Sequence, residues 1–256
     1  RCFGQVMQMF YEEISNEYII TQEGTSEGTQ IKYKKDGYWY KKDSRGHEGR
    51  AEYLVSRLLD FSTLGKDEYI RYEQGMINDH SGCRSRNFLE DGEELITFYR
   101  LYYNAMGKNL AQVIAAMDRM EDRIEYVIDF IRQSCGLDVR TYLSKILTLD
   151  MIVLNEDRHL NNLALIMKNN NFYPAPIFDN GVSLLTANSS INRHFSIEED
   201  VKRVSARPFS GSYEKMAEYL GKGFSLEYEA ALEWLEKETE SFERDVMIYQ
   251  LKRYKD

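Results

Sequence analysis

The sequence predicts an α+β protein with two lobes, a small antiparallel sheet with one helix followed by a larger, mainly helical body. Up to about residue 75 the chain is rich in short β-branched and aromatic stretches, and after residue 90 apolar residues recur at helical spacing. A pair of short apolar runs interrupts the helical part after residue 154. We therefore expect one lobe at 1–75 and another at 76–256, with a cleft between them of the kind in which ligands bind.

The first lobe is predicted to be a small sheet. Strands are expected at 17–20, 30–35, 37–42 and 67–73, and one amphipathic helix at 49–61. Asp36-Gly37 is the strongest hairpin signal in the chain, because both residues tolerate the positive φ of a tight turn. That turn fixes the register so that Lys32 pairs with Lys41, and their side chains share one face of the sheet.

Helices are predicted to dominate the second lobe. Apolar residues repeat at three- and four-residue spacing over 110–117 and 124–131. Asp138 is placed to cap a further helix that ends near Leu154, and the segment 225–254 returns to helical spacing.

Composition argues against a nucleic-acid-binding protein and against a membrane protein. The net charge of −9 repels phosphate-rich partners on average, and no apolar run approaches the length of about 20 residues that a membrane helix needs. The 3 scattered cysteines fit free thiols in a reducing compartment better than a disulfide framework. We expect a cytoplasmic protein that contacts neither nucleic acid nor membranes directly, with secretion as an effector as the alternative.

Polar residues flank the two apolar runs of the later lobe, at 163–167 and 175–178. The stretch between them, 168–171, is a lysine followed by three asparagines, and asparagine is typical of turns. A hairpin centred near residue 170 pairs residues whose numbers sum to about 341, which places Asn162 opposite Asp179. Amide and carboxylate oxygens are ligands that a hard divalent cation prefers, so this pattern indicates a metal site.

The earlier lobe supplies residues that suit phosphate groups. Gly24 and Gly28 lie in a turn with Ser26 between them, and glycines let backbone N–H groups approach a phosphate closely. Lys32 and Lys41 would repel each other on one face of the hairpin unless an anion lies between them.

Two assignments stay open on the residues alone. Lys42, on the opposite face, is the alternative to Lys41 as the phosphate-binding lysine, and the carboxylate that holds the lysine is Glu52 or Glu48. Together with Asp157, which lies where it can accept a proton from an incoming hydroxyl group, these residues supply what phosphoryl transfer needs.

Several motifs, which follow one another along the chain in the order found in kinases, resemble motifs of the protein-kinase-like superfamily. D-x-x-x-x-N at 157–162, followed by DNG at 179–181, resembles its catalytic and metal-binding loops, and DRHLNN is similar to HipA-like kinases and to phosphatidylinositol kinases. SEGTQIK at 26–32 resembles the phosphate loop of HipA-like kinases, which favours that family. YWYKKDS at 38–44 and AEYLVSRLL at 51–59 resemble its strand with the ATP lysine and its lysine-pairing helix.

The resemblance implies a protein-kinase-like fold and a serine/threonine kinase that uses ATP with Mg²⁺ or Mn²⁺. It implies that Asp157 is the catalytic base, that His159 steadies the loop or a phosphate, and that Asn162 and Asp179 are the metal ligands. YIRYEQ at 69–74 resembles the hinge. The implied ATP-binding residues are Gly24, Ser26, Gly28, Lys32, Lys41, Glu52, Tyr72 beside the adenine and Glu73 near the ribose.

The family includes bacterial toxins held by a DNA-binding antitoxin, and secreted effectors. The implied partners are therefore a protein substrate with a Ser or Thr acceptor and an antitoxin-type protein. HipA-like kinases also phosphorylate their own glycine loop, for which Thr25, Ser26 and Thr29 are the candidates here. The chain departs from HipA at Arg158, where HipA has a smaller residue. Two alternative functions remain, a small-molecule or lipid kinase and an ATP-binding pseudokinase or interaction module.

Overall fold

The chain forms two compact units, each assembled from stretches that lie far apart in the sequence. The computed structural model describes residues 9–20, 30–191 and 195–255. Unit 1 comprises Arg1–Asn87, Asp179–Arg203 and Leu226–Asp256, and unit 2 comprises Phe88–Phe178 and Val204–Ser225. The boundary expected between lobes near residue 75 stays a prediction.

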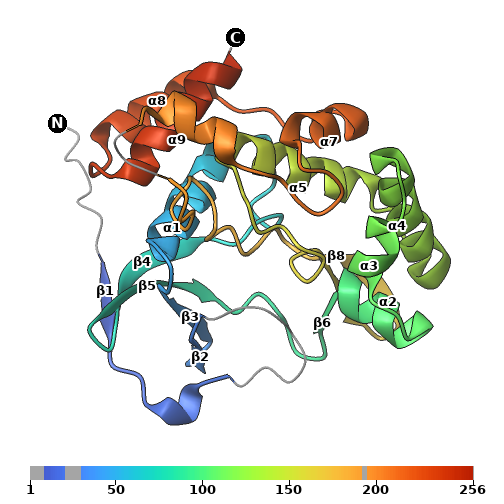
Figure 1. Cartoon of the computed structure of the whole chain (residues 1–256). Helices are drawn as coiled ribbons and strands as arrows, with labels where there is room; N and C mark the ends of the chain where they lie inside the picture. Colours follow the sequence, from blue (N-terminus) through green and yellow to red (C-terminus); the bar gives the residue numbers. More distant parts are fainter. Residues whose placement is uncertain (1–8, 21–29, 192–194, 256) are drawn as a thin grey trace. The chain divides into compact units, whose positions relative to one another are not determined.

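A five-stranded sheet forms the centre of unit 1 (Figure 1). Its strands are β1 (Phe10–Glu12), β2 (Lys32–Lys35), β3 (Tyr38–Lys42), β4 (Tyr72–Ile77) and β5 (His80–Arg86), in the order β1-β4-β5-β3-β2. The pair β2–β3 is antiparallel, as predicted; β3–β5 and β4–β5 are also antiparallel, whereas β1 runs parallel to β4 at one edge. The small β part with one packed helix is therefore confirmed, with a mixed edge that the sequence did not indicate.

The β2–β3 hairpin has the predicted register. Asp36 and Gly37 form the turn with φ of 50° and 77°, and Lys32 pairs with Lys41. The strand expected at 17–20 is instead a short 3₁₀ turn at Asn16–Tyr18 followed by a single bridge.

Helix α1 (Glu48–Leu58) packs against β4 and β5 through an apolar face that includes Leu54, Val55 and Leu58. It continues as a 3₁₀ turn at Leu59–Phe61, where the predicted helix ends. The other helices of unit 1 are α6 (Ile197–Asp200), followed by a 3₁₀ turn at Val201–Arg203, α8 (Tyr228–Lys237) and α9 (Phe242–Lys255). The helix expected over 225–254 is therefore two helices, since the backbone becomes extended at Glu238.

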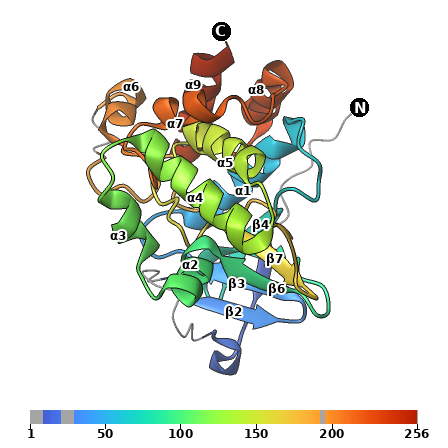
Figure 2. The same cartoon turned by 90° about the vertical axis from the view of Figure 1, so that its right-hand side faces the viewer.

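Unit 2 joins a three-stranded sheet to five helices among its described residues (Figure 2). The strands, in the order β6-β7-β8, are β6 (Glu94–Thr97), β7 (Ala164–Lys168) and β8 (Asn171–Pro174). The helices are α2 (Phe98–Met106), α3 (Leu110–Ala115), α4 (Met120–Cys135), α5 (Arg140–Val153) and α7 (Tyr213–Leu220), which packs on α5. The predicted periodic residues of α4 and α5 are buried, which confirms a mainly helical part. Within the described residues, no helix is long and apolar enough to span a membrane.

The register of the β7–β8 hairpin differs from the predicted one, because the turn lies one residue earlier in the chain than expected. Asn169 and Asn170, with φ of 52° and 61°, form the turn, so that Lys168 pairs with Asn171 and Leu165 with Pro174. The paired numbers sum to 339. The ladder ends before residue 162 on one side and before residue 179 on the other, and the predicted cross-strand pairing of those two residues is wrong.

Candidate functional site

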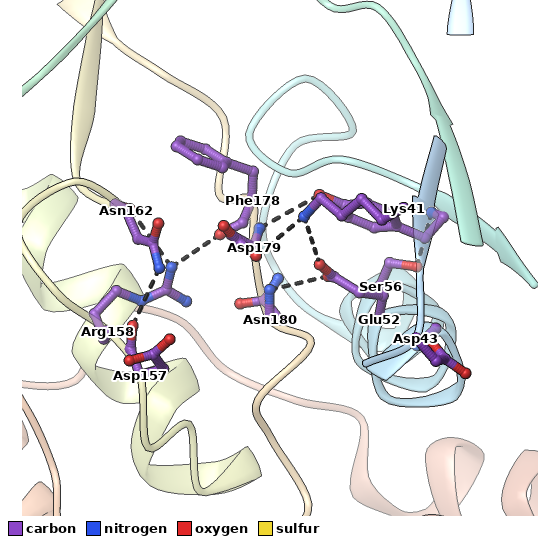
Figure 3. Close-up of polar contacts among 12 residues, drawn as sticks. Lys41, Asp43, Glu52, Ser56, Asp157, Arg158, Asn162, Phe178, Asp179 and Asn180 are labelled. Atoms are coloured by element: carbon purple, nitrogen blue, oxygen red, sulfur yellow. Dashed lines mark hydrogen bonds and ion pairs between the residues drawn. The ribbon is translucent and has the colours of Figure 1, made fainter. Parts of the chain in front are cut away.

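Three charged side chains from distant parts of the sequence meet in unit 1. Strand β3 carries Lys41, helix α1 carries Glu52, and Asp179 begins the segment that returns to this unit. The Lys41 ammonium lies 3.1 Å from Oε1 of Glu52 and 3.0 Å from Oδ1 of Asp179 (Figure 3). The side chains are 12%, 1% and 27% exposed, so Glu52 is wholly enclosed while Asp179 keeps access to solvent.

Burial and neighbouring charges shift the pKa values of Lys41 and Glu52 in opposite directions. Burial disfavours the ammonium form of Lys41, but the carboxylates of Asp179 and Glu52 raise the pKa of Lys41 well above its ordinary value. Burial raises the pKa of Glu52, and Lys41 offsets that change in part. The lysine therefore stays charged, and it stays so because of these two carboxylates. Glu48 is not its partner: the Glu48 carboxylate accepts backbone N–H groups of the preceding turn, at Ser44, Arg45 and Gly46.

The backbone around Asp179 is anchored by two hydrogen bonds. The Asp179 N–H donates to the Tyr72 hydroxyl at 3.3 Å, and the Asn180 N–H donates to Oε2 of Glu52 at 2.9 Å. Asp179 has a φ of 59°, a left-handed conformation that Asp adopts more readily than most residues. A Cβ on Gly181 would lie 3.2 Å from the Cβ of Glu48, so the DNG sequence suits a close approach to α1.

Tyr72 lies inside unit 1. It begins β4, is 5% exposed, and its ring faces the Lys41 ammonium at 5.4 Å from the ring centroid. Glu73 is exposed and paired with Arg84 at 2.5 Å on the neighbouring strand. The interpretation of 69–74 as a hinge stays a prediction, and the chain first passes from unit 1 to unit 2 between Asn87 and Phe88. The roles of Tyr72 beside adenine and of Glu73 near ribose stay predictions.

Lys32, the cross-strand partner of Lys41, is partly buried. Burial lowers the pKa of Lys32, Asp179 raises it, and the neighbouring Lys41 lowers it again. Within the described residues, the Lys32 ammonium has no carboxylate at ion-pair distance. A partly buried cation without a carboxylate partner favours an anion, which suits the predicted contact with phosphate. The other residues of the predicted phosphate turn, Gly24, Ser26 and Gly28, lie outside the described residues, as do Thr25 and Thr29.

In unit 2, the loop that carries Asp157 follows α5 directly. The helix ends at Val153, the following Leu154 turns the chain with a φ of 56°, and the Asn155 side chain accepts a hydrogen bond from the Asp157 N–H at 3.0 Å. The Asp157 side chain is 31% exposed. Nε2 of His159 lies 3.9 Å from Oδ2 of Asp157, so the predicted base and the predicted steadying histidine are neighbours.

Asn162 is oriented by the same loop. Its Nδ2 donates to the Asp157 carbonyl at 3.1 Å and lies 3.4 Å from Nε2 of His159. Within the described residues its Oδ1 accepts no hydrogen bond. The amide is thus held by its nitrogen and leaves its oxygen, the atom that a metal ion binds, without a protein donor.

Arg158 is the structural centre of this loop, which the motif pattern did not indicate. Its side chain is wholly buried and pairs with the equally buried Asp150 on α5, at 3.0 Å from Nε to Oδ2 and 2.9 Å from Nη2 to Oδ1. Nη1 donates to the Phe178 carbonyl at 2.8 Å and lies 3.5 Å from the Asn162 carbonyl (Figure 3). A single guanidinium therefore ties the loop both to a helix and to the residue that precedes Asp179. An acidic residue within the apolar stretch 147–153 was the sequence signal for this pair.

The arrangement has solved relatives. The chain is similar to the proinflammatory kinase CtkA of Helicobacter pylori, with 14% sequence identity and a TM-score of 0.63 over 92% of this chain and 90% of that one. It is also similar to HipA of Shewanella oneidensis, solved with HipB and operator DNA, with 10% identity and a TM-score of 0.53 over 94% of this chain and 66% of that one. The chain has a HipA-like kinase fold. No protein-family model matches the chain, and no curated protein matches its sequence.

This likeness confirms the fold that the motifs predicted. HipA is the longer protein, and the chain spans 66% of it, whereas it spans 90% of CtkA. At these identities the likeness establishes the fold, and the roles of individual residues stay predictions.

Proposed function

We propose that this protein is an ATP- and divalent-metal-dependent kinase that phosphorylates Ser or Thr residues of a protein. The observation that carries the proposal is the Lys41 ammonium held between Glu52 and Asp179 in a chain with a HipA-like kinase fold. A buried lysine kept charged by two carboxylates suits the binding of nucleotide phosphates, for which charge neutralisation and positioning matter most.

Lys41 and Lys32 bind the phosphates in this proposal. Lys41 on β3 and Lys32 on β2 are cross-strand partners, and burial together with repulsion by Lys41 lowers the pKa of Lys32. A polyphosphate between them turns that repulsion into attraction. Glu52 holds Lys41 in place, and Tyr72 supports both Lys41 and Asp179.

Asn162 and Asp179 fit a divalent ion. The Asn162 oxygen has no protein donor among the described residues, and Asp179 has a carboxylate with solvent access. The described residues contain no group of three or more His, Cys, Asp or Glu side chains that could hold a metal by themselves. A side-chain amide or carboxylate supplies one or two oxygen ligands, so the ion would need further oxygen ligands, which phosphates and water provide. When bound, Mg²⁺ or Mn²⁺ neutralises charge on the phosphates.

Asp157 accepts the proton of the acceptor hydroxyl group. Its backbone is fixed by Asn155 and by Nδ2 of Asn162, and its carboxylate remains partly exposed, as a group that must reach a substrate requires. His159 lies beside it and steadies the loop. Partners are a protein with a Ser or Thr acceptor and, by analogy with HipA and its partner HipB, an antitoxin-type protein in the cytoplasm.

The test is label transfer from γ-labelled ATP by the purified chain, with Mg²⁺ or Mn²⁺, with and without a generic protein acceptor. Asp157→Asn and Asp179→Asn are the test variants, and Asp118→Asn, an exposed aspartate of unit 2, is the matched control. We expect transfer by the wild type and by Asp118→Asn, and a loss of about 100-fold or more in both test variants.

The other outcomes separate the alternatives. Label on small alcohols or lipids but not on protein would favour a small-molecule or lipid kinase. Nucleotide binding without transfer to any acceptor would mean a pseudokinase. Mass spectrometry of the chain after incubation with ATP tests autophosphorylation, with a phosphate on Thr25, Ser26 or Thr29 as the expected result and an unmodified turn as the contrary one.

A further inference from the structure

A loop of unit 2 places an arginine beside the proposed catalytic base. Nη1 of Arg207 lies 3.7 Å from Oδ1 of Asp157, and the arginine side chain is 56% exposed. Asp157 thus has a cationic side chain near one carboxylate oxygen and His159 near the other. Arg207 belongs to no motif that the sequence displayed.

The backbone on both sides of Arg207 is fixed. Before it, Ala206 is buried and its N–H donates to the Gly211 carbonyl at 3.0 Å. After it, Phe209 is wholly buried and its carbonyl accepts Nη1 of Arg123 at 3.0 Å. The position of the arginine next to Asp157 therefore follows from the fold of this loop.

The contact between Arg207 and Asp157 is not a stability element. An ion pair with both side chains partly exposed adds little to folding. At 3.7 Å the guanidinium is not engaged in a two-point hydrogen bond, so most of its N–H donors remain available to another anion. The chain as a whole is acidic, with a net charge of −9, so this cation is a local feature and not part of a generally basic protein.

We propose that Arg207 binds the acceptor and selects acidic peptides, in which a carboxylate or phosphate lies next to the reactive Ser or Thr. This inference rests on the proposed function. An acceptor hydroxyl group must hydrogen-bond to Asp157 to pass on its proton, so the groups that flank it come within reach of Arg207. An acidic flanking group draws the guanidinium away from Asp157, which leaves that carboxylate to take the proton. A basic flanking group is repelled.

The test uses synthetic peptides with one Ser and one varied neighbouring residue, Glu, phosphoserine, Gln or Lys. For the wild type we expect kcat/KM to be about tenfold or more higher for the acidic peptides than for the Gln peptide, through KM, because a charge-assisted hydrogen bond is gained. Arg207→Gln should remove this preference, and Arg207→Glu should shift it to the Lys peptide. Arg119→Gln is the matched control, since Arg119 is an exposed arginine of the same unit paired with Glu121 at 3.6 Å.

Two results would overturn the inference while leaving the proposed function standing. One is an undiminished preference for acidic peptides in Arg207→Gln. The other is an equal fall in kcat for all peptides at unchanged KM, which would assign Arg207 to the transferred phosphoryl group instead. Absence of transfer from wild type to every peptide and protein acceptor would contradict the proposed function itself, and the inference with it.

Discussion

Lys41 and Asp179 are separated by 138 positions in the sequence, yet the lysine ammonium lies 3.0 Å from the aspartate carboxylate. Lys41 belongs to strand β3, and Asp179 is the first residue of the segment Asp179–Arg203. Glu52 on α1 is the third member of the cluster. In the proposed function, the ion pair between Lys41 and Asp179 opens when a nucleotide binds. In that function Lys41 would bind nucleotide phosphates and Asp179 would bind a divalent ion.

Replacing Lys41 by Met should abolish phosphoryl transfer and destabilise the protein. Removing the ammonium leaves Glu52 buried without its cation, which costs about 3 kcal/mol or more in the free energy of unfolding. Urea denaturation and γ-label transfer measure the two effects. Lys34→Met is the control, because Lys34 is exposed on the neighbouring strand over the Trp39 ring. Equal effects of the two substitutions would contradict the assignment of Lys41.

We expect the Arg158–Asp150 pair to matter more for the position of the loop that carries Asp157 than for the stability of the protein. Arg158→Met alone leaves Asp150 as a buried unpaired charge, and we expect a loss of about 3–5 kcal/mol. The double variant Arg158→Met/Asp150→Leu removes both charges and should recover most of that loss. Transfer should stay impaired in the double variant, because the Arg158 guanidinium no longer contacts the carbonyls of Phe178 and Asn162. Full activity in a stable double variant would show that the clamp is dispensable.

Tyr72→Phe distinguishes a positioning role from contact with adenine. The substitution removes the acceptor of the Asp179 N–H, at a cost of about 1 kcal/mol in stability, and should lower kcat with little change in the KM for ATP. A large rise in that KM at unchanged kcat would instead support the adenine contact that the resemblance implied. Tyr69→Phe, which loses a hydroxyl bond to Asp60 at 2.8 Å in the same unit, controls for the loss of a buried tyrosine hydroxyl.

Stability should depend on pH through Glu48. Burial alone would raise the pKa of Glu48, but the N–H donors of Arg45, Gly46 and Ser44 outweigh it and hold the pKa below its ordinary value of 4.5. A depressed pKa in the folded state means that the carboxylate stabilises the fold above pH 4.5, and that this contribution is lost as the pH falls through the folded value. Glu48→Gln should therefore cost about 1–3 kcal/mol at pH 7 and progressively less below pH 4.5 in urea denaturation. A cost that does not change with pH would contradict the assignment.

Local turn chemistry explains which parts of the fold were predictable. Asp36-Gly37 admits a single two-residue turn, and the register of β2–β3 came out as predicted. The run Asn169-Asn170-Asn171 admits alternative turns, each with residues that tolerate positive φ, and the choice between them depends on packing. Strand β5 was missed because His80–Arg86 is polar and nearly devoid of β-branched residues, and the pairing with β3 and β4 overrides that composition.

The candidate site was predictable where a motif spaces its residues, and not where tertiary contacts decide. The motifs predict that Lys41 pairs with Glu52, and the two side chains form an ion pair. The assignment of 69–74 to a hinge depends on contacts with a nucleotide, so it stays a prediction. The Arg158–Asp150 pair and the approach of Arg207 to Asp157 depend on how segments fold back, which spacing along the chain does not encode.

The most direct test of the central claim is a calorimetric titration of ATP, with and without Mg²⁺, into the wild type and into Asp179→Asn. We expect that the wild type binds ATP, that Mg²⁺ tightens binding by about tenfold or more, and that the variant loses this metal effect. The claim would be contradicted if the wild type did not bind ATP, or if Mg²⁺ strengthened binding equally in both proteins.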